Sequence, residues 1–408
     1  MADAATLDLS LRQRAARVIP KGMWGHLDAG RLPQGYPQFF ERGQGCRLWD
    51  VDGREYLDFM CSWGPIVLGH HDPDVEAAVE AQRAKGDCFN GPGTALVDLA
   101  ELLVEVIPHA DWTIMAKNGT DATTACVTIA RAGTRRRKVL VAKGAYHGAA
   151  PWCTPSLIGV TAEDRAHLAH YVFNDVPSLE AAVAQAGDDL AAILVTGFKC
   201  DQGFDHEMPT PEFAAACRRL ADAAGAALIV DDVRSGFRID LGGTWEAVGV
   251  RPDLSAYSKA IANGYALAAV TGNDRFRDAA AQVFTTGSFW YTSVAMAAAL
   301  ATIRKLRAID GVAHMRRMGE RLRDGIAAQA ARHGVALRQT GPAQMPVLLF
   351  DDDADRAKGN LFCVEALKRG VYLHPAHTMF LSAAHTADDI DQALAATDAA
   401  LAVVAARG

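Results

Sequence analysis

The sequence has no long uninterrupted run of apolar residues. A helix that crosses a bilayer needs about 20 consecutive, mostly apolar residues, and no stretch of this 408-residue chain approaches that length. The segment from Met1 to Pro20 mixes charged residues with alanine and lacks the apolar core of a signal peptide. We therefore predict a cytoplasmic protein that has no membrane partner.

Spacings typical of metal sites and of disulfide frameworks are also missing. The eight cysteines are scattered and include no CxxC pair, and the thirteen histidines include no HExxH pattern. Reduced thiols and no bound metal are therefore expected. The formal net charge of −7 argues against a nucleic-acid partner, because proteins that bind nucleic acids usually carry an excess of Lys and Arg to neutralise the phosphates.

Apolar segments of strand length alternate with segments of helical period through the part of the chain before Thr292. The strand-like segments are Trp112–Ala116, Lys138–Ala142, Ala191–Val195, Ala226–Val230 and Asp253–Tyr257. This alternation predicts an α/β domain with a mostly parallel sheet that helices cover on both faces. Long helical stretches and short strands after Thr292 predict a smaller α+β domain. We expect a large domain at residues 56–292, a small domain at 293–408, and an N-terminal segment at 1–55 that packs with the small domain.

Lys259 and Asp231 each follow one of the predicted buried strands. A pyridoxal phosphate (PLP) enzyme needs a lysine that forms a Schiff base with the cofactor. It also needs a carboxylate that keeps the pyridine nitrogen protonated, so that the ring withdraws electrons. A single lysine is usually a solvated surface charge, so this interpretation depends on the surrounding motifs.

One such motif is the turn Lys117-Asn118-Gly119-Thr120-Asp121, which follows a predicted strand and opens a predicted helix. Free N–H groups at a helix start bind phosphate, and a glycine lets the backbone approach it closely. Thr120 adds a hydroxyl, whereas Asp121 partly opposes an anion. Taken alone, this motif is better explained by an ordinary capped helix start.

A second turn, Tyr146-His147-Gly148, also follows a predicted strand. Tyr146 could stack on a planar cofactor, and Val233 would share a face with Asp231 and pack on the opposite side of the ring. These turns occur along the chain in the order phosphate turn, aromatic, carboxylate and lysine. Each lies at the carboxyl end of a strand, where open α/β sheets bind ligands.

Longer strings of residues resemble the class III (ω-type) aminotransferases of PLP fold type I. Within that family the chain is most similar to glutamate-1-semialdehyde 2,1-aminomutase and its relatives, over nearly its full length. The matching strings are Ile19–Gly22, Leu48–Gly53, Ser62–His70, Asn118–Ala122, Tyr146–Gly148, Asp231–Arg238, Ser258-Lys259, Gly370–Leu373 and Phe380–Thr386.

The resemblance implies a role for each motif residue. Lys259 is the Schiff-base lysine, and Asp231 is the partner of the pyridinium nitrogen. The cofactor-binding residues that it implies are Asn118, Gly119, Thr120, Tyr146, His147, Asp231, Val233, Lys259 and Ser288. Ser288 falls where the family places a hydroxyl on the phosphate of the neighbouring subunit, so the resemblance also implies an obligate homodimer with shared active sites.

The sequence departs from the aminomutase pattern on the substrate side. Asp28 falls where the aminomutase has an arginine for the substrate carboxylate, and two facing carboxylates would repel. Thr196-Gly197 replaces a Glu-Pro segment, and Asp232 replaces a glutamate. The substrate-side residues that we expect are Trp24, Asp28, Trp63, His374 and His377.

We predict a PLP-dependent aminotransferase that moves an amino group between a donor and an aldehyde or ketone acceptor. Lys259 would act as the acid and base for the proton shift. Asp28, the aromatic residues and the negative net charge favour a cationic or polyhydroxylated acceptor, such as an oxidised amino sugar or an aminoglycoside precursor. The alternative is a PLP-dependent isomerase, either glutamate-1-semialdehyde 2,1-aminomutase or an amino racemase or epimerase, because the same lysine suffices. A non-catalytic relative is the third hypothesis.

Overall fold

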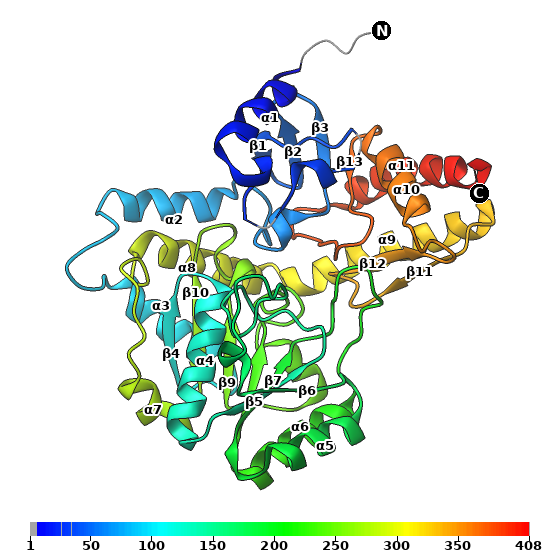
Figure 1. Ribbon diagram of the computed structural model, residues 1–408. Coiled ribbons are helices and arrows are strands. Elements are labelled where there is room, and N and C mark those ends of the chain that lie inside the picture. Colours follow the sequence, from blue (N-terminus) through cyan, green and yellow to red (C-terminus); the bar gives the residue numbers. More distant parts are fainter. Residues whose placement is uncertain (1–5, 26, 34, 408) are drawn as a thin grey trace.

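The computed structural model describes residues 6–25, 27–33 and 35–407, and it contains three sheets (Figure 1). The largest sheet has seven strands in the order β4-β10-β9-β8-β7-β5-β6. Its strands are β4 (Trp112–Ala116), β5 (Lys138–Ala142), β6 (Leu168–Tyr171), β7 (Leu190–Thr196), β8 (Ala227–Asp231), β9 (Leu254–Tyr257) and β10 (Ala268–Gly272). Only the pairings of β10 are antiparallel. The predicted mostly parallel α/β sheet is confirmed.

Alternate residues of the central strands point to opposite faces of this sheet. Ala192 and Leu194 of β7 pack in the cluster that includes α4 (Gly119–Thr134) and α7 (Arg277–Gln282). Ile193 and Val195 pack in the cluster of α5 (Val176–Ala186) and α6 (Pro211–Ala224). Apolar residues on both faces therefore explain why these strands read as continuous hydrophobic runs in the sequence.

The remaining strands form two small sheets. A four-stranded sheet has the order β1-β2-β3-β13, and β11 pairs with β12. These strands are β1 (Phe40–Gln44), β2 (Arg47–Asp50), β3 (Glu55–Asp58), β11 (Leu337–Thr340), β12 (Val347–Phe350) and β13 (Val371–Tyr372). Strands β2 and β3 form an antiparallel hairpin whose turn contains Asp52 and Gly53.

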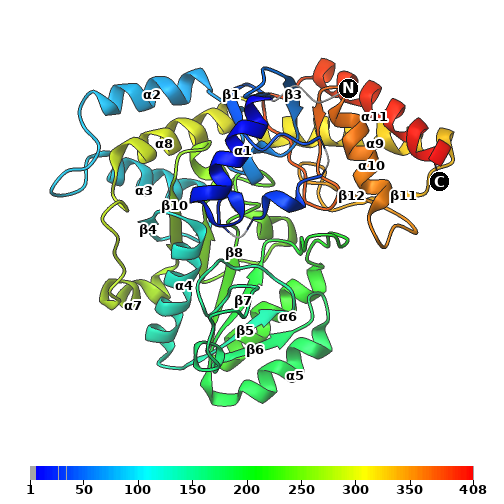
Figure 2. The same cartoon turned by 45° about the horizontal axis from the view of Figure 1, so that its top comes forward.

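The other long helices cover the sheets and link the two parts of the chain. They are α1 (Leu7–Val18), α2 (Pro73–Arg83), α3 (Ala95–Val106), α8 (Ser293–Ala308), α9 (Gly311–His333), α10 (Ala357–Leu367) and α11 (Ala387–Arg407). Helix α8 packs against α2 and α3, whereas α11 packs against α9 and α10. Figure 2 shows α9, α10 and α11 gathered beside the four-stranded sheet and away from α5 and α6.

The division of the chain at residues 55 and 292 stays a prediction.

No helix within the described ranges combines the length and hydrophobicity that a membrane crossing requires.

Candidate active site

Asp231 and Lys259 follow neighbouring parallel strands at one edge of the large sheet. Asp231 is the last residue of β8, and its partner across the ladder is Ala256 of β9. Lys259 comes two residues after the end of β9 and opens a short 3-10 helix, Lys259–Ala262. Ala227 and Ile229 of β8 face α4, and because the side chains of a strand alternate, Asp231 extends onto this same face. The start of α4 therefore lies on the side of the sheet that Asp231 faces.

The buried carboxylate of Asp231 is held by two donors. Nδ1 of His147 lies 2.7 Å from Oδ2 of Asp231, and the Val233 amide donates to Oδ1 at 3.1 Å. Because Nδ1 faces a carboxylate, it carries a proton and donates to Asp231. Nε2 of His147 is buried and has no hydrogen-bond partner among the described residues. An Asp231 carboxylate fixed in this way is ready for a cationic N–H donor.

The start of α4 has the features of a phosphate cradle. Asn118 and Asp121 form a reciprocal capping box, in which the Asp121 carboxylate accepts from the Asn118 amide at 3.2 Å. The Asp121 carboxylate is thus hydrogen-bonded to the backbone at the start of its own helix. These bonds offset part of the repulsion that we expected between Asp121 and a bound anion. The Gly119 and Thr120 amides have no acceptor within the helix because they lie in its first turn. The Thr120 hydroxyl accepts from the Ala149 amide at 3.1 Å and keeps its own proton to donate.

Gly119 has no room for a side chain. An added Cβ would lie 2.6 Å from Cγ1 of Val233, so these two residues are in direct contact. The same test at Gly148 places a Cβ 2.6 Å from the Thr120 hydroxyl oxygen. The contacts at Gly119 and Gly148 therefore bring together the turn after β4, the turn after β5 and the segment that follows β8.

Lys259 has the electrostatic setting that a reactive amine requires. Burial lowers its pKa to about 8, the positive charge of Arg234 adds to this effect, and Asp231 opposes it. The Lys259 side chain passes Gly64, where an added Cβ would lie 3.3 Å from Cδ of the lysine. The backbone of Lys259 is left-handed, with φ of 47°, and non-glycine residues with such strain gather at functional sites.

Tyr146 and Ser288 occupy exposed positions. Tyr146 is 51% exposed, so its ring is free to stack on a planar ligand. Ser288 is exposed, and its carbonyl accepts a long, weak hydrogen bond from the Cys88 thiol. No contact between Ser288 and the α4 start is recorded within the described part of the chain. The contacts above therefore link the expected cofactor residues of one subunit other than Tyr146 and Ser288.

Three of the expected substrate-side residues form one aromatic wall. The Trp63 ring meets the His377 ring edge-on at 4.7 Å between centroids and the His374 ring at 5.7 Å. Burial lowers the pKa of His374 to about 4 and that of His377 to about 3. Both imidazoles are therefore neutral at physiological pH.

The other two substrate-side residues are engaged elsewhere or exposed. The Asp28 carboxylate accepts from the Gly30 amide at 2.9 Å as the cap of a short 3-10 helix, Ala29–Arg31. Trp24 is 62% exposed. No contact links either of them to the wall within the described residues, so their role at the substrate site stays a prediction.

Asp232 and Arg238 are buried next to the site and fix the loops around it through hydrogen bonds. The buried Asp232 carboxylate accepts from the Thr244 amide at 2.7 Å and from the Ser235 and Thr244 hydroxyls. Arg238 is fully buried and donates to the carbonyls of Gly64 and Ile66 at 2.7 and 2.8 Å and to that of Leu381. The sequence contained Arg238 as part of a matching string, but no local signal showed that it holds the Gly64 loop against Lys259.

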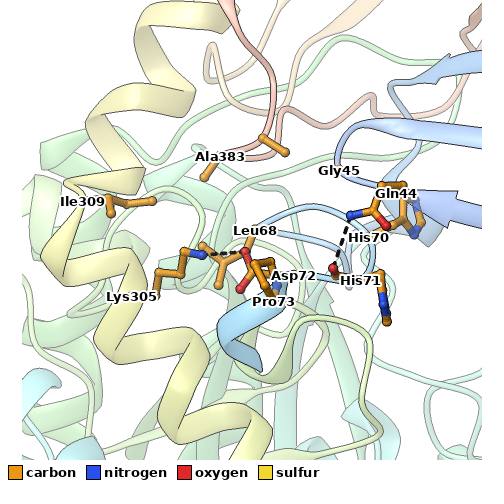
Figure 3. A pocket seen from close by; sticks show the side chains of 11 residues that line it. Gln44, Gly45, Leu68, His70, His71, Asp72, Pro73, Lys305, Ile309 and Ala383 are labelled. Carbon is orange, nitrogen blue, oxygen red and sulfur yellow. Dashed lines mark hydrogen bonds and ion pairs between the residues drawn. The ribbon is translucent and has the colours of Figure 1, made fainter. Parts of the chain in front are cut away.

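A separate cavity of about 230 Å³ opens between the start of α2 and the end of α8 (Figure 3). None of the predicted site residues lines it. Each of its titratable side chains already has an ion-pair partner: His70 with Asp58, His71 with Glu76, and Asp72 with Lys305. This cavity therefore lacks the free reactive groups that the Lys259 site has. No group of three or more possible metal ligands occurs among the residues that the structure describes.

The residues around Lys259 fit PLP. The α4 start offers amides and a hydroxyl to a phosphate, Asp231 offers a carboxylate to the pyridinium nitrogen, and Lys259 offers an amine of lowered pKa. The sandwich of the ring between Tyr146 and Val233 stays a prediction.

Comparisons with known proteins agree with this geometry. Residues 32–401 match the family model of class III aminotransferases. The chain is 47% identical to the aminopentol aminotransferase of Sphingopyxis macrogoltabida, across 98% of this chain and 94% of the relative. It is 32% identical to the glutamate-1-semialdehyde 2,1-aminomutase of Nitrosomonas europaea, across 95% of each chain.

A solved structure of a relative with the same sequence identity, 47%, has the same fold. The FumI protein of Sphingopyxis sp. MTA144, in a PLP form, superposes with a TM-score of 0.96 at 47% identity and covers 97% of this chain and 96% of its own. The resemblance to the aminomutase is thus confirmed. It is more distant, at 32% identity, than the similarity to the aminopentol aminotransferase, at 47%. The chain belongs to the class III aminotransferases, and it is a PLP-dependent aminotransferase of fold type I.

Proposed function

We propose that this aminotransferase removes the amino group from an amine that carries several hydroxyl groups and passes it to a 2-oxo acid, in a reversible reaction. A relative that is 47% identical is named for an aminopentol, which is an amine of this kind. The observation that carries the proposal is the neutral wall of Trp63, His374 and His377. The His377 ring lies 6.1 Å from the Phe380 ring between centroids, and Phe380 lies beside Gly64, which contacts Lys259. It supports the polyhydroxylated class of substrate that the sequence favours.

The hydrogen bonds of the wall assign its two tautomers. Nδ1 of His374 accepts from the Ala376 and His377 amides at 3.2 and 3.0 Å, so the proton of His374 is on Nε2. Nδ1 of His377 donates to the Thr378 carbonyl at 2.7 Å, so Nε2 of His377 is an acceptor. The wall thus offers one donor and one acceptor, which suits hydroxyl groups because each can both donate and accept.

When bound, PLP supplies an electron-poor ring that stabilises negative charge on the carbon attached to the amino group. Asp231 holds the proton of the ring nitrogen in place, and His147 fixes the carboxylate that does so. Lys259, as a desolvated amine, takes a proton from the substrate carbon at Nζ and returns one. Gly64 lies against Cδ of Lys259, and the Phe380 ring lies beside Gly64, so this stretch of the lysine side chain is covered on one side.

Product analysis by mass spectrometry tests the substrate class. We expect a 2-amino polyol and pyruvate to give the matching ketone and alanine over many turnovers. Without pyruvate the ketone should not exceed one equivalent per active site, because each site takes up one amino group and needs an acceptor to release it. Conversion of the amine over many turnovers without any oxo acid would instead support the isomerase hypothesis. The variant His377→Phe should raise KM for the polyol amine while leaving KM for a hydroxyl-free amine of equal length unchanged. An equal rise for both amines would contradict the assignment of the wall.

We also propose an obligate homodimer in which Ser288 of each subunit completes the phosphate site of the other. Support comes from the exposure of Phe284, at 93%, and of Phe289, at 63%, on the loop that carries Ser288. Large apolar groups exposed together are typical of interfaces. Mixing Lys259→Ala subunits with Ser288→Ala subunits would create one intact site in each mixed dimer. We expect activity above that of either variant alone, and sedimentation as a dimer. Unchanged activity on mixing, or an active monomer, would contradict this proposal.

The cytoplasmic location is retained as a proposal. All eight cysteines are free in the structure, which suits a reducing compartment.

A further inference from the structure

Arg234 is a cation at the site that the reaction described so far does not use. It follows Val233 directly, and its side chain is partly buried. Nη1 of Arg234 lies 3.4 Å from the Cys200 carbonyl and 3.6 Å from the Cys200 sulfur. Both are long contacts to uncharged groups, and no described carboxylate forms an ion pair with this guanidinium.

The charge of Arg234 acts on the reactive groups themselves. After burial, it is the second cause that lowers the pKa values of Lys259 and His377. Cys200 is a neutral thiol, because burial raises its pKa. Cys200, which Arg234 contacts, packs against the cluster that contains Phe380. The Phe380 ring lies 6.1 Å from the His377 ring between centroids and lies beside Gly64, which contacts Lys259. The guanidinium therefore lies on the Lys259 and His377 side of the site.

A partly buried guanidinium without an anion is unfavourable, because it has lost water without gaining a charged partner. Its planar fork matches a carboxylate, which it can bind through two parallel hydrogen bonds. A 2-oxo acid carries its carboxylate on the carbon that reacts. A carboxylate held at Arg234 would therefore leave the adjacent carbonyl carbon close to Lys259.

Other charged groups of the site do not offer this function. Asp28, where the aminomutases have an arginine, is a carboxylate bonded to Gly30. Arg238 is fully buried and spends its donors on backbone carbonyls. Asp201 is close enough to feel the charge of Arg234, yet the two form no ion pair.

We propose that Arg234 binds the carboxylate of the small co-substrate, the 2-oxo acid and the amino acid formed from it, while the wall of Trp63, His374 and His377 receives the larger amine. This assignment rests on the proposed transfer from an amine to a 2-oxo acid. It divides the site into a charged pocket for one substrate and a neutral surface for the other.

The test compares Arg234→Gln, Arg234→Lys and wild-type holoenzyme in the two half-reactions, measured separately by rapid mixing. A matched control is Arg219→Gln on α6, whose exposed arginine pairs with Glu180 at the surface. With pyruvate, Arg234→Gln should show a KM roughly tenfold to a hundredfold higher, with partial recovery in Arg234→Lys. The half-reaction with the amine, compared at a pH above the Lys259 pKa of both enzymes, should stay within about twofold of wild type.

A binding measurement separates this proposal from the proposed function. Propanoate, a carboxylate that cannot react, should quench the tryptophan fluorescence of the wild-type holoenzyme and of Arg219→Gln, but not of Arg234→Gln. This result does not depend on which amine is the substrate, so it stands even if the polyol amine is not converted. Equal propanoate binding by wild type and Arg234→Gln would overturn the proposal. Equal slowing of both half-reactions with an unchanged KM for pyruvate would also overturn it, and would indicate that Arg234 acts on the cofactor.

Discussion

The Nδ1 atom of His147 lies 2.7 Å from Oδ2 of Asp231, and both side chains are buried. This pair joins the turn after β5 to the end of β8, and it orients the Asp231 carboxylate on the face of the sheet that α4 covers. Asp231→Asn keeps the shape and an acceptor for His147 but removes the negative charge. We expect the transfer rate to fall roughly a hundredfold to ten-thousandfold, as measured by kcat/KM with a saturating second substrate.

The variant His147→Gln is the control for this prediction. It keeps the Asp231 charge and a side-chain donor, so its rate should fall much less than that of Asp231→Asn. An Asp231→Asn enzyme as fast as wild type would show that the Asp231 charge has no part in the reaction.

Gly119→Ala should weaken PLP binding. The new Cβ would lie 2.6 Å from Cγ1 of Val233, so Val233 or the start of α4 must move. Equilibrium dialysis should show a dissociation constant for PLP at least about tenfold higher, since each tenfold step corresponds to about 1.4 kcal/mol. Gly91→Ala is the matched control, because its Cβ would meet nothing within 4 Å. Equal affinities in the two variants would contradict the contact between Gly119 and Val233.

The amine of Lys259 should titrate well below an exposed lysine. Its pKa of about 8 in the cofactor-free chain means that the ammonium predominates below about pH 8 and the neutral amine above it. Lys85 is exposed and serves as the reference lysine in the same chain. Competitive acetylation at a series of pH values, followed by peptide mass spectrometry, measures both residues in one sample.

The variant Arg234→Gln should raise the midpoint of Lys259, because it removes a nearby positive charge that disfavours the ammonium. Parallel titration curves for Lys259 and Lys85 would contradict the buried setting of the amine.

Sequence reasoning worked well where a segment had a strong pattern of its own. The bounds of β4 and β5 match the predicted ranges residue for residue. Asp231, Lys259 and the start of α4 could be placed at one sheet edge because parallel strands end on the same side. The short strands β6 and β10 and the helices α5 and α7 were not predicted.

Contacts between distant segments could not be derived from local patterns. The pairing of His147 with Asp231 joins residues 84 positions apart, and Arg238 bonds to carbonyls more than 140 positions away. The exposed position of Trp24 and the local cap made by Asp28 depend on how the N-terminal loop folds. Such facts depend on tertiary packing, which no periodicity or motif in one sequence records.

Arg238 should contribute to stability as well as to the site. Arg238→Met would leave the carbonyls of Gly64, Ile66 and Leu381 without their buried donor. We expect a loss of about 2–4 kcal/mol in the free energy of unfolding, measured with urea on the cofactor-free protein. The control Arg219→Gln should change it by less than about 0.5 kcal/mol, as is usual for exposed residues. A Met variant as stable as wild type would show that the guanidinium does not hold the loop.

Borohydride reduction of the holoenzyme, followed by peptide mass mapping, tests most directly the claim that Lys259 carries the cofactor. The account predicts that the reduced PLP group is found on the peptide containing Lys259, and that no lysine is labelled in Lys259→Ala. A label on another lysine, or equal labelling in Lys259→Ala, would contradict the account.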